Sequence, residues 1–150
     1  MSRLTNAERE EFARVVVALG DPAAADKDTL LARLGALSAR TDTFEALPPA
    51  DEADAIGPRG DVFQGVWATA AELRRSGALL ALGRRIACPV VAIHGDYDPH
   101  PAEGVAEPLS SILSGFRFIL LEKCGHKPWV ERYARDEFYA ILRDCVMQDL

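Results

Sequence analysis

The chain has 150 residues, of which 49% are hydrophobic and 27% are charged. Its formal net charge of −6 argues against a nucleic-acid partner, because phosphate recognition requires clustered lysine and arginine. No apolar run approaches the roughly 18–20 residues of a membrane span, and three widely spaced cysteines favour the reducing cytoplasm over a disulfide framework. We therefore expect a cytoplasmic globular protein, or part of one, with neither a nucleic-acid nor a membrane partner.

The first half of the chain has the pattern of helices. Apolar residues recur at helical spacing and predict four helices, which begin near Thr5, Asp28, Asp61 and Leu79. Thr5 opens a capping box and Asp61 is the expected cap of the third helix. Between the second and third helices, roughly residues 41 to 60, prolines and glycines predict a long loop.

The second half changes to an alternation of strands and helices. Two short apolar runs, Pro89 to His94 and Phe116 to Leu121, have the pattern of buried parallel strands. A helix is expected between them, around Ala102 to Leu113, and a last helix from about Trp129 to Val146. The buried stripe of that last helix is predicted to consist of Tyr133, Phe138, Ile141 and Leu142. This order implies a parallel crossover and an α/β fold class.

The residues that follow the two predicted strands include a carboxylate and an imidazole, which are suited to acid–base catalysis. Asp98 lies just after the first strand and His126 just after the second. Ligands bind beyond the carboxyl ends of parallel strands, and neighbouring strands are about 4.8 Å apart. The two side chains are therefore expected to meet, with the aspartate orienting a histidine that acts as general base and then as general acid.

The sequence around these residues resembles the last two strands and triad loops of α/β-hydrolases. The matching features are Gly95-Asp-Tyr-Asp98 after the first strand and Gly125-His126 after the second. The resemblance covers residues 86–150, as the C-terminal part of the hydrolase core, and by position residues 1–85 are similar to the helical cap segment. It implies hydrolysis of an ester, amide or peptide-like bond in a small-molecule or peptide-like substrate, without a cofactor.

Two parts of the family pattern are absent from the chain. The nucleophile elbow Gly-x-Ser-x-Gly occurs nowhere, and neither does the oxyanion-hole loop. The serine belongs after an earlier strand, and the chain is expected to start too late to contain it. We therefore expect an incomplete, truncated α/β-hydrolase fold that is inactive alone. The alternative is a non-catalytic remnant or an interaction subunit.

Each prominent residue also has a purely structural interpretation. Asp98 favours a turn before Pro99, and His126 is the passive loop residue in that interpretation. Asp96 is expected to form a turn, although it is the nearest substitute for Asp98. Cys124 is expected to be a small buried residue, and Trp129 to pack in the core rather than to contact a substrate.

A metal site is a further alternative. His94, Asp96, Asp98 and His100 alternate, and an extended segment places alternate side chains on one face. Pro99 and the turn at Gly95 interrupt that geometry, so this alternative ranks below the hydrolase interpretation.

The strand at Val90 to Ile93 is also expected to leave one edge unpaired. An apolar, β-branched edge is a template for association, so self-association of the chain is predicted.

Overall fold

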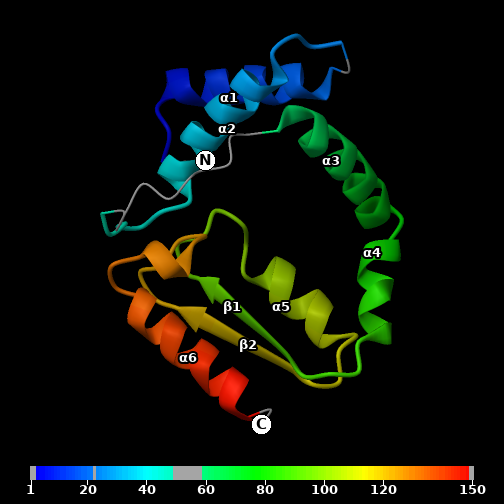
Figure 1. Cartoon of the computed structure of the whole chain (residues 1–150), viewed down its shortest axis with the longest axis vertical. Helices are drawn as coiled ribbons and strands as arrows, with labels where there is room; N and C mark the ends of the chain where they lie inside the picture. The colour runs from blue at the N-terminus through cyan, green and yellow to red at the C-terminus, as the bar shows by residue number, and fades with distance from the viewer. Residues whose placement is uncertain (1–2, 22, 49–58, 149–150) are drawn as a thin grey trace. The chain divides into compact units, whose positions relative to one another are not determined.

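The computed structural model describes residues 3–21, 23–48 and 59–148, and Figure 1 shows the path of the chain. The chain forms two compact units. The first comprises Met1–Thr41 and Ala50–Gly77, and the second comprises Asp42–Pro49 and Ala78–Leu150. The central part of the predicted long loop, residues 49–58, lies outside the described residues.

The two units divide the chain at other positions than the predicted segments 1–85 and 86–150. Residues 42–49 and 78–85 belong to the second unit. The assignment of the predicted segments to a cap and a core stays a prediction.

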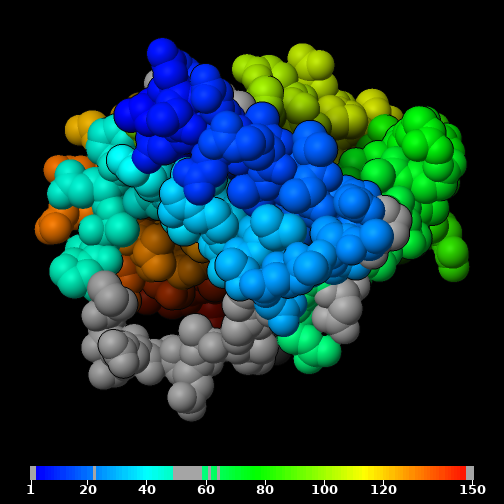
Figure 2. Space-filling model, turned by 90° about the horizontal axis from the view of Figure 1, so that it is seen from above, coloured from blue at the N-terminus to red at the C-terminus, as the bar shows by residue number. Residues whose placement is uncertain are grey.

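The first unit is helical, as predicted. Its helices are α1 (Asn6–Gly20), α2 (Lys27–Thr41) and α3 (Gly60–Arg75). The capping box is confirmed, since the amide of Glu8 donates to the Thr5 hydroxyl at 3.3 Å and the amide of Thr5 donates to Glu8 Oε2 at 2.8 Å. α1 and α2 pack against each other, as Figure 2 shows in blue and light blue.

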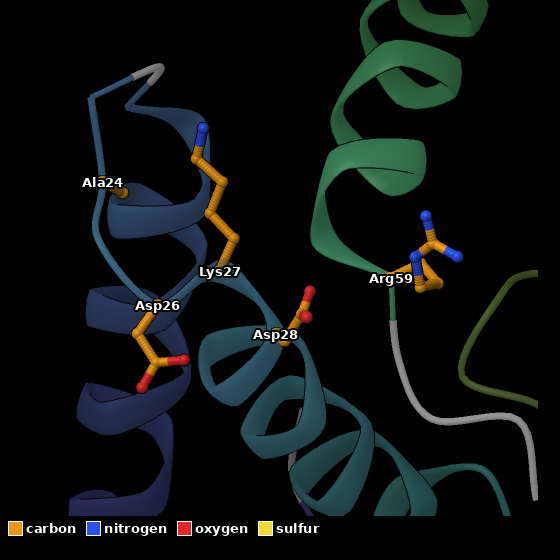
Figure 3. A pocket seen from close by; sticks show the side chains of 5 residues that line it. All are labelled: Ala24, Asp26, Lys27, Asp28 and Arg59. Carbon is orange, nitrogen blue, oxygen red and sulfur yellow. The ribbon is translucent and has the colours of Figure 1, made fainter.

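The predicted cap of the third helix is wrong. α3 begins at Gly60, so Asp61 already lies inside the helix rather than before it. The first amide of α3 instead donates to a carboxylate of another helix, from Gly60 N to Asp28 Oδ1 at 2.7 Å. Asp28 lies at the start of α2, opposite the start of α3 (Figure 3). A tertiary contact therefore satisfies the donor that a local cap was expected to satisfy.

The second unit contains the sheet. Its elements are α4 (Ala78–Ala81), η1 (Leu82–Arg85), β1 (Val90–Gly95), α5 (Glu103–Ser110), β2 (Phe116–Leu121), η2 (Pro128–Val130) and α6 (Arg135–Gln148). The two strands are parallel, in a register that pairs Val90 with Phe116 and Gly95 with Leu121. Both strands and the α/β class were predicted from the sequence.

The core of the second unit lies between the strand pair and α6. Leu121, Cys124 and Ala134 are fully buried there, and partly buried apolar side chains pack against them. These side chains come from both strands and from α6, namely Ile93, Ile119, Phe138 and Ile141. Figure 1 shows the strands running side by side between α5 and α6.

The predicted start of the last helix is wrong by six residues. Residues 128–130 form a short 3-10 turn, and α6 begins only at Arg135. The intervening backbone pairs with a distant segment, since Leu47 N donates to Val130 O and Arg132 N donates to Glu45 O, both at 2.8 Å. These bonds replace the helical ones that the sequence pattern predicted.

The predicted buried stripe is correspondingly half right. Phe138 and Ile141 pack against the core, whereas Tyr133 is 53% exposed and Leu142 is 43% exposed. Among the helices of the described residues, none has the length and apolar character needed to cross a membrane.

We predict that the chain self-associates in solution. Within the described residues the sheet has two strands, so each strand keeps an outer edge, and Leu120 of β2 is 50% exposed. Leu120→Lys is expected to lower the association constant, because an edge-strand lysine opposes strand addition. The measurement is sedimentation velocity at several protein concentrations. Val17→Lys, at a 76% exposed position of α1, is the control that leaves association unchanged. A monomer at every concentration contradicts the prediction.

Candidate active site

The loops that follow the two strands are bonded to each other. We refer to residues 96–102 as the Asp loop and to residues 122–127 as the His loop. The amide of Asp96 donates to Leu121 O at 2.9 Å, and the amide of Tyr97 donates to Cys124 O at 2.8 Å. In return, the amide of Cys124 donates to Asp96 Oδ1 at 3.1 Å. Because both strands point the same way (Figure 1), these bonds hold the two loops together at one end of the sheet.

The glycine at the end of β1 is required by this contact. A Cβ atom on Gly95 would overlap the carbonyl oxygens of Cys124 and Gly125. The backbones of β1 and the His loop approach so closely that no side chain fits between them. Close packing against the His loop therefore explains why the Gly95-x-x-Asp98 pattern begins with a glycine.

Gly125, which precedes His126, is also required by a close backbone contact. A Cβ atom on Gly125 would overlap the carbonyl oxygen of Asp42 and the carboxylate of Glu131. The amide of His126 donates to the same Asp42 carbonyl at 2.6 Å. The backbone around His126 is thus held against the segment at residues 42–47.

A buried carboxylate completes this arrangement. Glu131 is fully buried and accepts three backbone amides: Gly125 N at 2.9 Å, Phe44 N at 2.8 Å and Glu45 N at 2.8 Å. Charge-assisted bonds to a carboxylate are stronger than neutral ones, and three of them compensate for burying the charge. Glu131 therefore joins the His loop to the segment at residues 42–47. Sequence reasoning did not identify it, since an isolated glutamate carries no motif.

The predicted meeting of Asp98 and His126 is confirmed. His126 Nδ1 lies 2.7 Å from Asp98 Oδ2. Because a carboxylate accepts, the ring donates from Nδ1, and this leaves Nε2 for another partner. The Asp98 side chain is 5% exposed and that of His126 is 48% exposed. The pair therefore has a buried acid and an accessible base, while the catalytic role of both residues stays a prediction.

All three histidines of the chain face the same carboxylate. The His100 amide and its Nδ1 both donate to Asp98 Oδ1, at 2.8 Å and 2.9 Å. His94 Nε2 lies 3.7 Å from Asp98 Oδ2, while its Nδ1 donates to Gly95 O at 2.9 Å. The sequence had grouped His94 and His100 with Asp98, but not with His126.

These partners change the acidity of Asp98. Burial by itself raises the pKa of Asp98 and is the largest single effect. The bonds from the His100 amide and from the rings of His126 and His100 together outweigh it and bring the pKa below its usual value. Asp98 is therefore an ionised acceptor at neutral pH.

The other candidate residues have structural positions. Asp96 acts as a turn residue whose carboxylate caps the His loop at Cys124, so the alternating set of His94, Asp96, Asp98 and His100 is not brought together. Cys124 is fully buried as predicted, and burial raises the pKa of its thiol to about 12. It is thus a poor nucleophile. The expected core position of Trp129 is wrong, since the residue is 46% exposed, although its ring lies 6.0 Å from that of Phe138.

A separate hollow lies in the first unit. It has a volume of about 470 Å³ and is lined by Ala24, Asp26, Lys27, Asp28 and Arg59, at the starts of α2 and α3 (Figure 3). Its acid Asp28 already accepts the amide of Gly60. The hollow is polar and open and contains neither a histidine nor a thiol, so it offers no acid–base pair comparable to Asp98 and His126.

Comparison with known proteins finds no matching family model, no similar curated protein and no similar solved structure. The geometry of Asp98 and His126 is therefore the basis on which a function can be proposed.

We predict that Gly95→Ala destabilises the protein by about 3 kcal/mol or more, since the new methyl group displaces the His-loop backbone. Gly104→Ala in α5 is the matched control, because no atom outside its chain neighbours and its own helix backbone lies within 4 Å of the added Cβ. It leaves stability unchanged or raises it by up to about 1 kcal/mol. Urea unfolding compares the two variants. Equal midpoints contradict the proposed close contact.

We also predict that Glu131→Gln lowers the free energy of unfolding by about 1–3 kcal/mol, since the side-chain amide nitrogen cannot accept a backbone N–H. Hydrogen exchange of the Gly125 amide is expected to accelerate. Glu122→Gln, at an exposed position of the His loop, is the control that changes neither quantity. Wild-type exchange in Glu131→Gln would show that the carboxylate does not hold the loop.

Proposed function

We propose that Asp98 and His126 are the acid and base of a Ser-Asp-His triad in an incomplete α/β-hydrolase fold. The bond that this triad would hydrolyse is an ester, amide or peptide-like bond of the substrate. The observation that carries the proposal is the 2.7 Å contact from His126 Nδ1 to a buried, ionised Asp98. The order of the two residues after consecutive parallel strands supports the same function.

The proposed chemistry assigns one step to each atom. A serine hydroxyl supplied by another segment or chain gives its proton to His126 Nε2 as its oxygen attacks the carbonyl carbon of the substrate. Asp98 Oδ2 keeps its bond to Nδ1–H and stabilises the imidazolium. His126 then protonates the leaving group as the bond breaks, which leaves the acyl group on the serine. In the second half it takes a proton from the attacking water and gives it to the serine oxygen as the acid is released.

The surroundings of Asp98 suit that role. Its side chain is 5% exposed, so little water competes for Oδ2. The amide of Asp98 donates to Gly95 O at 3.2 Å, and Oδ1 is occupied by the two His100 donors. The carboxylate therefore has little rotational freedom, and Oδ2 is the oxygen left for His126. Such prior orientation is what a catalytic acid contributes.

The chain alone is expected to turn over no p-nitrophenyl ester and to resist labelling by a fluorophosphonate probe. It contains no Gly-x-Ser-x-Gly elbow, and each missing oxyanion donor costs on the order of 10²–10³ in rate. Ester turnover by the chain that disappears in His126→Ala contradicts this arrangement.

The direct test supplies the nucleophile. The in-frame DNA upstream of Met1 and the neighbouring genes are read for a Gly-x-Ser-x-Gly elbow, and that polypeptide is produced together with this chain. Turnover of a p-nitrophenyl ester is expected to fall about 10²–10⁴-fold in His126→Gln and in Asp98→Asn. Glu122→Gln is the control with wild-type turnover. The absence of an elbow, or turnover that is indifferent to His126, favours the alternative of a non-catalytic interaction subunit.

A further inference from the structure

We propose that Asp98, His100 and His126 form a binding site for a divalent transition-metal ion of the zinc class. This site stands independently of the proposed hydrolase function. Its ligand set also differs from the alternating set in the sequence, because it exchanges His94 and Asp96 for a histidine of the other loop.

The three side chains converge on one point. One potential ligand atom from each of them, a histidine nitrogen or a carboxylate oxygen, lies within 4.8 Å of the others. The two rings contact different oxygens of Asp98: Oδ2 lies 2.7 Å from His126 Nδ1, and Oδ1 lies 2.9 Å from His100 Nδ1. With metal–ligand bonds of about 2.0–2.1 Å, tetrahedral ligand atoms lie about 3.3 Å apart. Each of these two contacts therefore has to lengthen by about half an ångström, and the side chains have to turn so that one oxygen and both nitrogens face the same ion.

The burial pattern permits these changes. Asp98 is 5% exposed and is held from several sides, whereas the His100 and His126 side chains are 69% and 48% exposed. The two rings can move toward solvent without disturbing the core. The site thus consists of one fixed anionic ligand and two adjustable imidazoles, whose centroids lie 5.3 Å apart.

Charge and proton balance are also satisfied. Without a metal, each ring points an Nδ1–H at the carboxylate. On binding, each ring moves its proton to Nε2 and offers the Nδ1 lone pair to the ion, so no net proton is released from neutral rings. The carboxylate keeps its negative charge and gains a +2 partner. The net charge of the three side chains with the ion changes from −1 to +1.

The ligand types select the class of metal. Two imidazole nitrogens and one carboxylate oxygen suit Zn²⁺, Co²⁺ or Ni²⁺, whereas Mg²⁺ and Ca²⁺ prefer oxygen ligands alone. Three protein ligands leave a fourth position for water or a substrate oxygen, as in catalytic zinc sites. Metal binding and the serine-type proton relay exclude each other here, because both require Nδ1 of His126 and the carboxylate of Asp98.

The experiment titrates Zn²⁺ into the chelator-treated 150-residue chain by calorimetry, with Co²⁺ absorption as a second readout of coordination. One ion per chain is expected. We expect the zinc affinity to fall by at least about 10–100-fold in each of three variants, Asp98→Asn, His100→Ala and His126→Ala. Loss of a residue that only hydrogen-bonds a metal ligand already has an effect of that size. Glu122→Gln is the matched control with wild-type affinity, since Glu122 is an exposed carboxylate of the His loop outside the cluster of Asp98, His100 and His126.

Three results overturn the proposal. They are no zinc binding by the wild type, wild-type affinity in His126→Ala, and Mg²⁺ binding as tight as that of Zn²⁺. Circular dichroism checks that each variant is folded. His100 is the most exposed of the three ligands, so His100→Ala is the variant expected to stay folded and to test the site if another variant unfolds. The zinc titration needs no substrate, and the ester assay of the proposed hydrolase is to be repeated with a chelator present. A failure of one proposal can therefore be told from a failure of the other.

Discussion

The close backbone contact between Gly95 and the His loop is the constraint on which the site depends. No side chain fits between that glycine and the carbonyls of Cys124 and Gly125, and hydrogen bonds of Asp96 and Tyr97 join the loops beside it. The contact determines how far Asp98 lies from His126. Two exposed loops of independent conformation would lose much conformational entropy when Asp98 and His126 pair. Here the backbone contacts already order both loops, so forming the pair costs less entropy.

Glu131 extends the same constraint to a remote part of the chain. Its buried carboxylate gathers three amides from two segments, one of which is 86 to 87 residues away in sequence. A buried charge without these donors would cost several kcal/mol, so the segment at residues 42–47 and the His loop stabilise each other. This coupling also explains why the chain is extended at Glu131 and why α6 starts late.

The chemistry of the site follows from having one carboxylate among three imidazoles. Asp98 is ionised, nearly buried and bonded through both oxygens. The proposed proton transfer and the proposed metal binding would use the same two groups, Asp98 and His126, so the protonation of His126 Nδ1 would decide between them. A protonated Nδ1 gives a base at Nε2, and a deprotonated Nδ1 gives a metal ligand. His100 separates the two proposed functions, because its ring would bind the ion in the metal site but only orients Asp98 in the proton relay.

The sequence by itself determined the local features. The Thr5 capping box, both strands, the α/β class and the meeting of Asp98 with His126 depend on short-range patterns and on the rule that parallel strands end together. Three features were decided only by the tertiary structure: the capping of α3 by Asp28, the late start of α6 and the presence of His100 beside His126. The first two involve residues distant in sequence that satisfy one another's hydrogen bonds, and the third involves two histidines that bond the same carboxylate. Such contacts leave no periodic signal in the sequence, because a buried donor can bond to any acceptor that the fold brings within reach.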